Sequence, residues 1–263
     1  MTSQAKQREW LEQWTLLQDN ESFLFEEWIY PTRLEDFRGK LVLDCGCGGG
    51  QHINLCAPFA ARIIGVDLNT AELARNRTRN YSNVEVLEGD IASFTYPEPF
   101  DIVYCVGVIH HTNQPDATFD NLVRLCKPGG LIIVWCYSLE GNRLVRWIVE
   151  PLRKMLLSKL SRHSLLTISK WITALMYVPA HTIYRLSFFR FAPYFEYLGN
   201  FRRLSFDRNV LNVFDKLNAP HTDFISRDRI EKWFARDEFA SKVIEPYKGV
   251  SWRATGILKG SQR

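Results

Sequence analysis

Three carboxylates and a pair of histidines stand out among the side chains that could do chemistry. Asp44, Asp67 and Asp90 each close a short apolar or alternating run, and His110 and His111 close the run DIVYCVGVI. The carboxyl ends of parallel strands meet at one edge of a sheet, where open α/β folds bind ligands. Carboxylates there suit hydroxyl or cationic groups, and imidazole suits proton transfer near neutral pH.

A glycine loop directly follows the first acid, in the stretch DCGCGGGQ. Glycine permits positive φ and lets the backbone approach a ligand without a Cβ in the way. The loop reads Gly46-x-Gly48-x-Gly50 and continues with Gln51, whereas the dinucleotide-binding turn reads GxGxxG. Asp44 beside it would repel a pyrophosphate but could hold a cation. The pattern therefore favours a nucleoside with a positive appendage and no phosphate, which describes S-adenosylmethionine.

The elements that must position these residues predict an α/β fold. Strand-like runs (KLVLDCG, RIIGVDLN, VEVLEGD, PFDIVYCVGVIHH, GGLIIVWCYS) alternate with helical patterns up to residue 137, which is typical of βαβ units and a parallel sheet buried on both faces. A helix and two more strand-like runs follow residue 220. Thr70 and Ser226 are the expected helix N-caps. We expect a Rossmann-like, seven-stranded, mostly parallel sheet with helices on both faces.

Three segments follow from this pattern. Residues 1–39 form an N-terminal helical cap, and residues 40–137 with 221–263 form the ligand-binding core. Residues 138–220 form a mainly helical insertion after the fifth strand, expected to cover the strand ends and to be mobile. Aromatic residues recur at helical spacing before residue 30, which fits a packed cap or a segment that covers a ligand.

The motifs VLDCGCGGG, GVDLN, EGDI, FDIVYCVGVIHHT and LCKPGGLIIV, in this order and spacing, resemble the class I S-adenosylmethionine-dependent methyltransferases. The resemblance implies methyltransferase activity with S-adenosylmethionine as the cofactor. It also implies the cofactor-binding residues: Asp44, Gly46, Gly48, Gly50 and Cys105 at the methionine part, Asp67 at the ribose, Asp90 and Ile91 at the adenine, and Leu68, which is assigned to no particular part.

Methyl transfer mainly requires that nucleophile, methyl group and sulfur are held in line and that water is excluded. A general base helps when the nucleophile is a hydroxyl or an acidic carbon. His111 and His110 are the best candidates, because they close the fourth strand beside the expected methyl position. His221, after the insertion, could return to the same mouth. Packing, capping or a loop hydrogen bond is the alternative for each.

The insertion is strongly basic. Residues 138–210 carry 12 Lys or Arg against four Asp or Glu, so their surplus exceeds the net charge of +4 for the whole chain. Aromatic and aliphatic residues are interleaved with these cations. Three roles of the insertion are compatible with this pattern. It could form a lid or dimer face, a pocket for an apolar or acidic acceptor, or a peripheral contact with an anionic membrane or nucleic acid.

Composition narrows the remaining choices. The hydrophobic fraction of 46% and charged fraction of 24% are those of a globular protein. The six cysteines form no CxxC pair and lie mostly in apolar runs, so no structural metal is expected. The first residues lack an apolar signal core, and we expect a cytoplasmic protein.

We expect a methyltransferase acting on oxygen or carbon of a small, apolar or lipid-like acceptor. The alternatives are methylation of a modified tRNA, disfavoured by the acidic remainder of the chain, and a cofactor-binding interaction protein without turnover.

Overall fold

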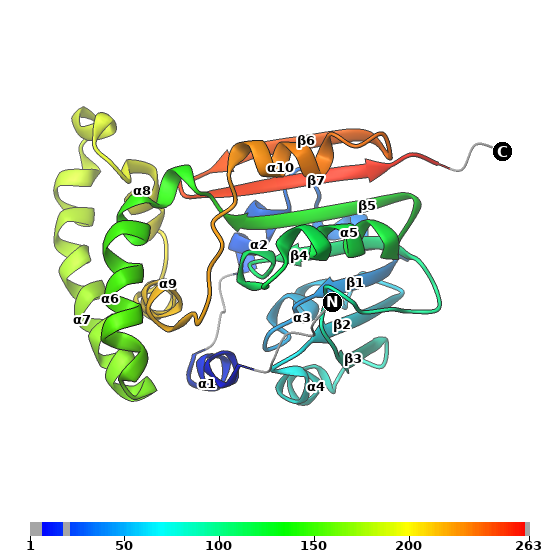
Figure 1. The fold of residues 1–263 in the computed structure, drawn as a ribbon, viewed down its shortest axis with the longest axis horizontal. Helices are drawn as coiled ribbons and strands as arrows, with labels where there is room; N and C mark the ends of the chain where they lie inside the picture. The colour runs from blue at the N-terminus through cyan, green and yellow to red at the C-terminus, as the bar shows by residue number, and fades with distance from the viewer. Residues whose placement is uncertain (1–6, 18–21, 261–263) are drawn as a thin grey trace.

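A computed structural model describes residues 7–17 and 22–260 of the chain. Its centre is a seven-stranded sheet in the order β3-β2-β1-β4-β5-β7-β6 (Figure 1). The first five strands are parallel, β7 is antiparallel to β5, and β6 is antiparallel to β7. The predicted Rossmann-like fold is confirmed. The strands are β1 (Leu41–Cys45), β2 (Arg62–Asp67), β3 (Val84–Glu88), β4 (Phe100–Val106), β5 (Cys126–Tyr137), β6 (Phe239–Tyr247) and β7 (Ser251–Leu258).

Ten α-helices accompany the sheet within the described residues. They are α1 (Arg8–Leu16), α2 (Ser22–Ile29), α3 (Gln51–Cys56), α4 (Ala71–Thr78), α5 (Pro115–Leu125), α6 (Glu150–Met155), α7 (Arg162–His181), α8 (Phe195–Phe201), α9 (Phe206–Asn218) and α10 (Arg227–Phe234). Short 3₁₀ turns span Leu34–Phe37, Ile109–His111, Glu140–Asn142, Leu157–Lys159, Ile183–Arg185 and Ser187–Phe191, and a π-turn spans Val145–Val149.

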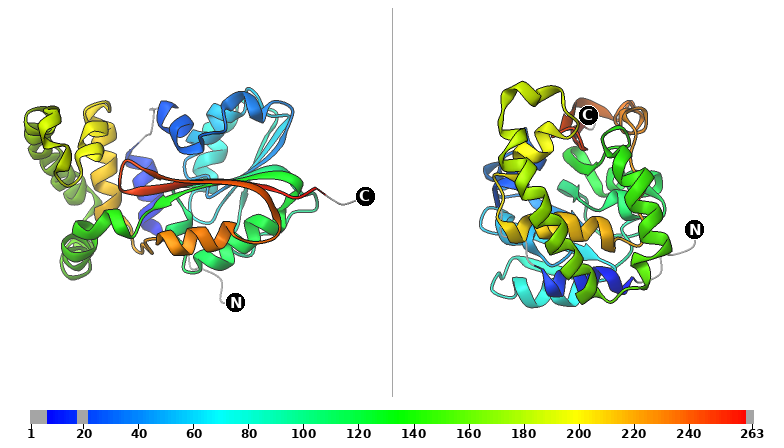
Figure 2. Two further views of the ribbon diagram at one scale, coloured as in Figure 1. Left: turned by 90° about the horizontal axis from the view of Figure 1, so that it is seen from above. Right: turned by 90° about the vertical axis from the view of Figure 1, so that its left-hand side faces the viewer.

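The two faces of the sheet bury separate apolar layers, because successive strand residues point to opposite sides. In β1, Val42 faces the layer that includes α2, α3 and α4, and Leu43 faces the layer that includes α5 and α10. In β5, Ile133 and Ile132 divide in the same way. Figure 2 shows these helices on either side of the edge-on sheet. The sheet is therefore a rigid support for residues at its edges.

Two expected helix caps have different outcomes. Ser226 caps α10, since its hydroxyl accepts a hydrogen bond from the Arg229 backbone N–H at 3.2 Å. Thr70 occupies the N-cap position of α4 but makes no capping bond. Its hydroxyl donates instead to the Gly48 carbonyl. Thr70 is thus at the predicted N-cap position, but its side chain bonds to the glycine loop, which supplies a buried acceptor within reach.

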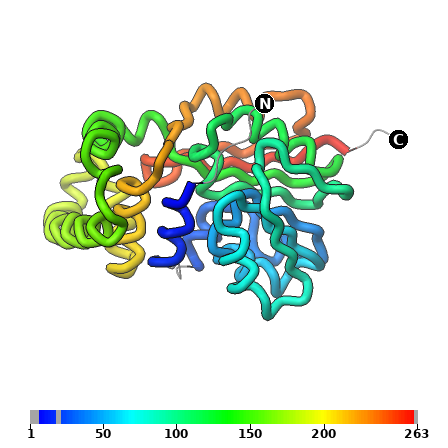
Figure 3. Tube along the Cα trace, turned by 60° about the horizontal axis from the view of Figure 1, so that its bottom comes forward, coloured from blue at the N-terminus to red at the C-terminus, as the bar shows by residue number. Residues whose placement is uncertain are grey.

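The insertion lies at the end of the molecule toward which β1, β2, β4 and β5 point (Figure 1). Its helices α6 and α7 pack on α9, and α1 lies between α9 and the glycine loop (Figure 3). Leu165 of α7 shares a small core with Val213, Phe214 and Leu217 of α9. Within residues 7–17 and 22–260, none of the helices combines the length and apolar composition needed to cross a bilayer.

Candidate active site

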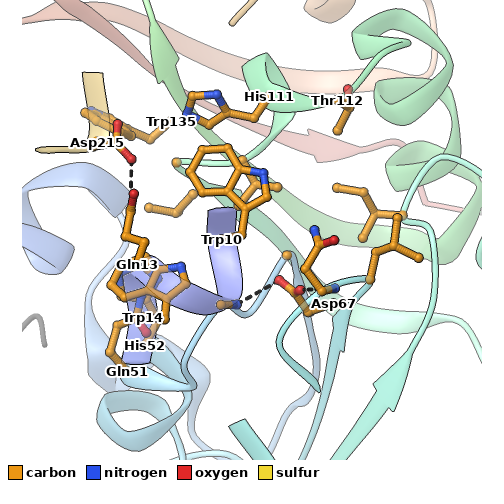
Figure 4. Close-up of a pocket in the computed structure, with 18 of the residues that line it drawn as sticks. Trp10, Gln13, Trp14, Gln51, His52, Asp67, His111, Thr112, Trp135 and Asp215 are labelled. Atoms are coloured by element: carbon orange, nitrogen blue, oxygen red, sulfur yellow. Dashed lines mark hydrogen bonds between the residues drawn. The ribbon is translucent and has the colours of Figure 1, made fainter. Parts of the chain in front are cut away.

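A pocket lies at the carboxyl ends of the parallel strands, between the sheet, α1 and α9 (Figure 4). His111 and three α1 residues, Trp10, Gln13 and Trp14, line its middle. The glycine-loop half is lined by Gly46, Gly48, Asp67, Leu68, Asn69, Gly89, Asp90 and Ile91. The α9 half is lined by Trp28, His52, Trp135, Tyr137, Arg208, Leu211, Asn212 and Asp215.

Asp67 organises the glycine-loop half. Its carboxylate accepts backbone N–H bonds from Gly48 at 3.0 Å, Asn69 at 2.7 Å and Thr70 at 2.8 Å. Burial raises the pKa of this carboxyl group, and the three backbone donors oppose that rise. Two carboxylate oxygens have about four acceptor sites, so Asp67 can still accept from a ligand hydroxyl. Asp90, at the other end of this half, accepts from the Ala92 N–H at 3.0 Å.

Asp44 lies beneath the loop and does not line the pocket. It is 1% exposed, and its Oδ2 atom has no hydrogen-bond partner among the described residues. Burial raises the pKa of Asp44 to about 8. A buried carboxylate oxygen without a partner is costly, and a cationic ligand above the loop would stabilise the charged form of Asp44.

The lining of the glycine-loop half fits the expected cofactor. The eight residues named for this half include two carboxylates and no Lys, Arg or His side chain, so their side chains favour a cation over a phosphate. Gly46 and Gly48 adopt positive φ values of 84° and 54°, a backbone conformation that needs glycine. A ligand with ribose hydroxyls, an adenine and an ammonium group, such as S-adenosylmethionine, suits these residues.

His111 stands where the two halves of the pocket meet. Its Nδ1 lies 2.8 Å from the His221 carbonyl oxygen, which can only accept, so Nδ1 carries the proton. Burial is the main cause that lowers the pKa of His111. The neutral ring therefore keeps an unprotonated Nε2, the form that a general base requires. The ring centre of Trp10 lies 4.7 Å from that of His111, and Figure 4 shows Trp10 between His111 and Asp67.

The other two histidines are placed differently. His110 is fully buried outside the pocket lining, and neither ring nitrogen has a hydrogen-bond partner among the described residues. It packs against Tyr137, with ring centres 4.4 Å apart. The side chain of His221 is exposed, and only its carbonyl reaches the site, by holding His111. The structure thus brings one imidazole ring of the three to the pocket.

Gly50 and Cys105 also lie outside the pocket lining. Gly50 is the N-cap residue before α3 at a φ of 80°, and a Cβ there would meet Thr78 Cγ2 at 2.9 Å. Glycine at this position is required for helix packing. Cys105 is fully buried in the sheet, and the residues after it, Val106 and Gly107, line the pocket instead.

The α9 half combines aromatic walls with a small polar cluster. Trp28 and Trp135 stack with ring centres 4.6 Å apart. Asp215 of α9 accepts from the Tyr137 hydroxyl at 2.9 Å and from the Gln13 amide at 3.0 Å. Arg208, seven residues before Asp215 on the same helix, is 7% exposed and donates to Asn212 at 2.6 Å. A flat apolar ligand with a polar substituent would find partners here.

Helix α1 joins the two halves through polar contacts. On the glycine-loop side, the Gln7 N–H donates to Asn69 Oδ1 at 2.7 Å, and Arg77 donates to the Trp14 carbonyl at 2.7 Å. On the α9 side, Gln13 bonds to Asp215, and Asn218 donates to the Glu9 carbonyl at 2.9 Å. The N-terminal aromatic residues therefore cover the pocket, the second of the two sequence alternatives.

Sequence reasoning missed the α9 contribution and the walls Trp135 and Tyr137. The amphipathic pattern of residues 206–218 carried the signal for a helix, but nothing in it indicated which partner that helix meets. Among the described residues, no group of three or more His, Cys, Asp or Glu side chains could hold a metal ion.

Comparisons with known proteins agree with this geometry. Residues 43–134 match a family model described as a methyltransferase domain. The chain is 31% identical over 115 residues to a ubiquinone biosynthesis O-methyltransferase of Azoarcus sp. (strain BH72), which covers 40% of this chain and 49% of that protein. It is 32% identical over 120 residues to a "Probable S-adenosylmethionine-dependent methyltransferase" of Mycolicibacterium smegmatis, covering 45% and 46%. The chain spans about half the length of these relatives.

Solved structures are similar over nearly the whole chain. The N-methyltransferase NodS from Bradyrhizobium japonicum WM9, in complex with S-adenosyl-L-homocysteine, superposes with a TM-score of 0.53 at 14% identity. The match covers 96% of this chain and 99% of that protein, and it shows the fold alone. Together with the matched motifs and the acidic glycine-loop pocket, these comparisons show that residues 43–134 are a methyltransferase domain of the class I, S-adenosylmethionine-dependent type.

Proposed function

We propose that this protein transfers a methyl group from S-adenosylmethionine to oxygen or carbon of a small acceptor with an apolar or lipid-like body. The observation that carries the proposal is His111, a buried neutral imidazole whose Nδ1 is fixed by the His221 carbonyl at 2.8 Å. It stands between an acidic half that suits the cofactor and an aromatic half that suits an acceptor.

The glycine-loop half would hold the cofactor. Asp67 and Leu68 are assigned to the ribose, and Asp90 and Ile91 to the adenine. Asp44, beneath the loop, is assigned to charge compensation of the ammonium group, as its buried and unpartnered Oδ2 suggests. When bound, S-adenosylmethionine supplies a methyl group that the sulfonium charge already activates, so the protein need not activate a leaving group.

The α9 half would hold the acceptor between Trp28, Trp135 and Leu211. Nε2 of His111 is assigned to remove the proton from the acceptor hydroxyl or acidic carbon as the new bond to methyl forms. Asp215 raises the proton affinity of His111 through its negative charge, which supports the imidazolium that results. Arg208 adds a positive charge that favours an acceptor with an anionic or electron-rich substituent.

The insertion has two assignments within this proposal. Its helix α9 forms the acceptor wall and closes the pocket, which excludes water, and its outer helices provide a face for a partner. The basic surplus of the chain is confined to this segment, so we do not assign nucleic acid as the acceptor. We further propose a cytoplasmic location, supported by six cysteines that are all buried and free of disulfides.

The test has two stages. Calorimetric titration should give S-adenosylmethionine binding and no comparable NADH binding. Incubation with methyl-labelled cofactor and a panel of phenols, enols and amines should then label an oxygen or carbon acceptor, with nuclear magnetic resonance locating the methyl group. Tight NADH binding without S-adenosylmethionine binding would contradict the cofactor assignment, and exclusive labelling of amines would contradict the acceptor assignment.

A further inference from the structure

The outer helices of the insertion expose an unusual amount of apolar surface. Of the 19 large apolar side chains that are exposed among the described residues, 14 lie between residues 144 and 191. They include Trp147 at 76%, Trp171 at 69%, Phe188 at 76% and Phe191 at 77% exposed. Large exposed apolar patches on a folded domain mark sites that bind a protein or a membrane.

The exposed residues follow helical stripes. On α7, Trp171, Leu175 and Val178 recur at spacings of four and three on the face opposite the buried Ser169 and Thr173. Leu165, also buried, packs on α9. The stretch 144–156 shows a similar stripe, with Leu144, Ile148, Leu152 and Met155 at spacings of four, four and three. These helices thus bury one apolar face on α9 and present a second one outward. Figure 2 shows them gathered at one end of the molecule.

The charge of this segment selects the partner. Residues 151–195 contain seven Lys or Arg and no Asp or Glu. Arg153 pairs with Glu150, and Arg162 pairs with Glu9 and Glu12. The other five cations, Lys154, Lys159, Lys170, Arg185 and Arg190, are exposed and take part in no ion pair among the described residues. The surface is therefore positive as well as apolar.

We propose that the exposed residues of 144–191 dock on an anionic lipid membrane without spanning it. Interfacial segments of this kind insert aromatic and aliphatic side chains at the headgroup boundary while Lys and Arg attract anionic lipids. A second copy of the chain fits less well, because a two-fold interface places this face against itself and would oppose cation to cation. RNA fits less well, since the exposed aliphatic side chains gain nothing from phosphates.

Docking would place the acceptor pocket close to the bilayer. Helix α9 carries Arg208, Leu211 and Asp215 on the pocket side, while Phe214 and Leu217 support α7 on its other side. Helices α7 and α9 thus lie between the docking surface and the pocket. With the outer insertion on the membrane, a lipid-like acceptor would have a short path from the bilayer to the pocket. That the acceptor is lipid-like rests on the proposed function.

The experiment is flotation of the full chain with vesicles of phosphatidylcholine alone or mixed equally with phosphatidylglycerol. We expect binding to the anionic vesicles only, weakening with salt. Lys159→Gln with Lys170→Gln should weaken it about 25-fold, since each basic residue near such a surface contributes about a fivefold factor. The matched control is Lys40→Gln with Lys242→Gln, two exposed lysines of the core, which should bind as wild type does.

A second pair separates the apolar contribution. Trp147→Ser with Trp171→Ser should abolish flotation while leaving the circular dichroism spectrum and cofactor titration unchanged. Equal binding to neutral and anionic vesicles, or equal loss in the lysine pair and its control, would overturn the proposal. A wild-type protein that binds no vesicles, sediments as a dimer and becomes a monomer in the tryptophan double variant would also overturn it. So would RNA binding that the tryptophan double variant retains. Flotation needs no turnover, so failure of methyl transfer leaves this result standing.

Discussion

Two tryptophans show how differently the sheet core and the insertion use the same side chain. Trp233 of α10 is 2% exposed, stacks on Phe119 with ring centres 5.1 Å apart, and donates to Asp116 at 2.6 Å. Trp171 of α7 is 69% exposed. The core therefore uses its aromatic residues to hold the fold, whereas the outer insertion presents them to something outside the chain.

Charge divides the molecule in the same way. Arg229 of the core pairs with Asp116 and Asp223, while Lys170 and Arg190 of the insertion take part in no ion pair among the described residues. Residues 151–195 carry seven Lys or Arg and no Asp or Glu, whereas the rest of the chain carries 26 against 29. The uncompensated positive charge therefore lies on the outer insertion, where the proposal places an anionic partner. The pocket lies at the boundary, and each experiment below tests one side of this division.

The largest expected effect tests the chemistry at the boundary. His111→Gln should lower turnover by roughly 10²–10⁴ if His111 is the base, with cofactor affinity nearly unchanged. The matched control is His221→Gln, whose exposed side chain is dispensable because its carbonyl makes the contact with His111. Stopped-time assays with labelled cofactor provide the measurement.

The dependence of turnover on pH at the acid side tests the protonation state of His111. Burial lowers the pKa of His111 below 6.5, so the base stays neutral down to a lower pH than a free imidazole. As the pH is lowered, wild-type turnover should fall only below pH 6.5, the ordinary pKa of histidine. A variant that transfers methyl at the wild-type rate would leave His111 with packing alone.

The tryptophan pair can break the comparison directly. Trp233→Ala should cost about 3–5 kcal/mol of unfolding free energy through its cavity. Trp171→Ala should change it by less than about 0.5 kcal/mol, as for an ordinary surface position. Urea denaturation of both variants is the measurement. Similar losses in the two would mean that the insertion uses Trp171 structurally.

Cofactor affinity should depend on the strand ends at one edge of the core and not at the other. Asp67→Ala should weaken S-adenosylmethionine binding by about 1.5–3 kcal/mol, the range for hydrogen bonds to a charged group. Asp101→Ala removes an acid at the opposite end of the strands, where it accepts from the Leu41 N–H at 2.8 Å, and should leave the affinity unchanged. Calorimetry on both decides, and equal losses would point to general destabilisation.

The smallest expected effect is the change in unfolding free energy per pH unit that Asp44 causes. Its folded-state pKa is raised to about 8 from 3.8, so the folded protein holds a proton that the unfolded chain has released. Stability from this group is complete below the unfolded value and is lost as pH rises toward 8. The slope is at most about 1.4 kcal/mol per pH unit. Asp44→Asn should flatten it in denaturation series without cofactor, and an unchanged slope would assign it to other groups.

Much of the core was predictable because its signals are local. The glycine loop, the acids at the strand ends and the alternation of strands and helices are each contained within a few residues, and the observed sheet follows that pattern. The placement of His111 at the pocket follows from its position after β4. The ring centre of His110, its immediate neighbour, lies 4.1 Å from that of His111 but outside the pocket lining, a difference that adjacent positions in the sequence do not reveal.

The rest depends on contacts between distant segments. Gln13 and Asp215 meet across 202 positions, and neither residue carries a local signal for the other. Thr70 donates to a loop 22 positions earlier in preference to its own helix. The roles of Arg208 and Tyr137 likewise depend on where α9 packs, and no pattern in residues 206–218 determines that.

Helix α1 has a consequence for the order of events during turnover. It contacts Asn69 beside one half of the pocket and Asp215 beside the other, and Trp10 lies across the middle (Figure 4). A ligand that displaces α1 loses the free energy of these contacts once, and the next ligand finds them already broken. Cofactor and acceptor should therefore strengthen each other's binding by the same factor in either order, since coupling between two binding equilibria is reciprocal.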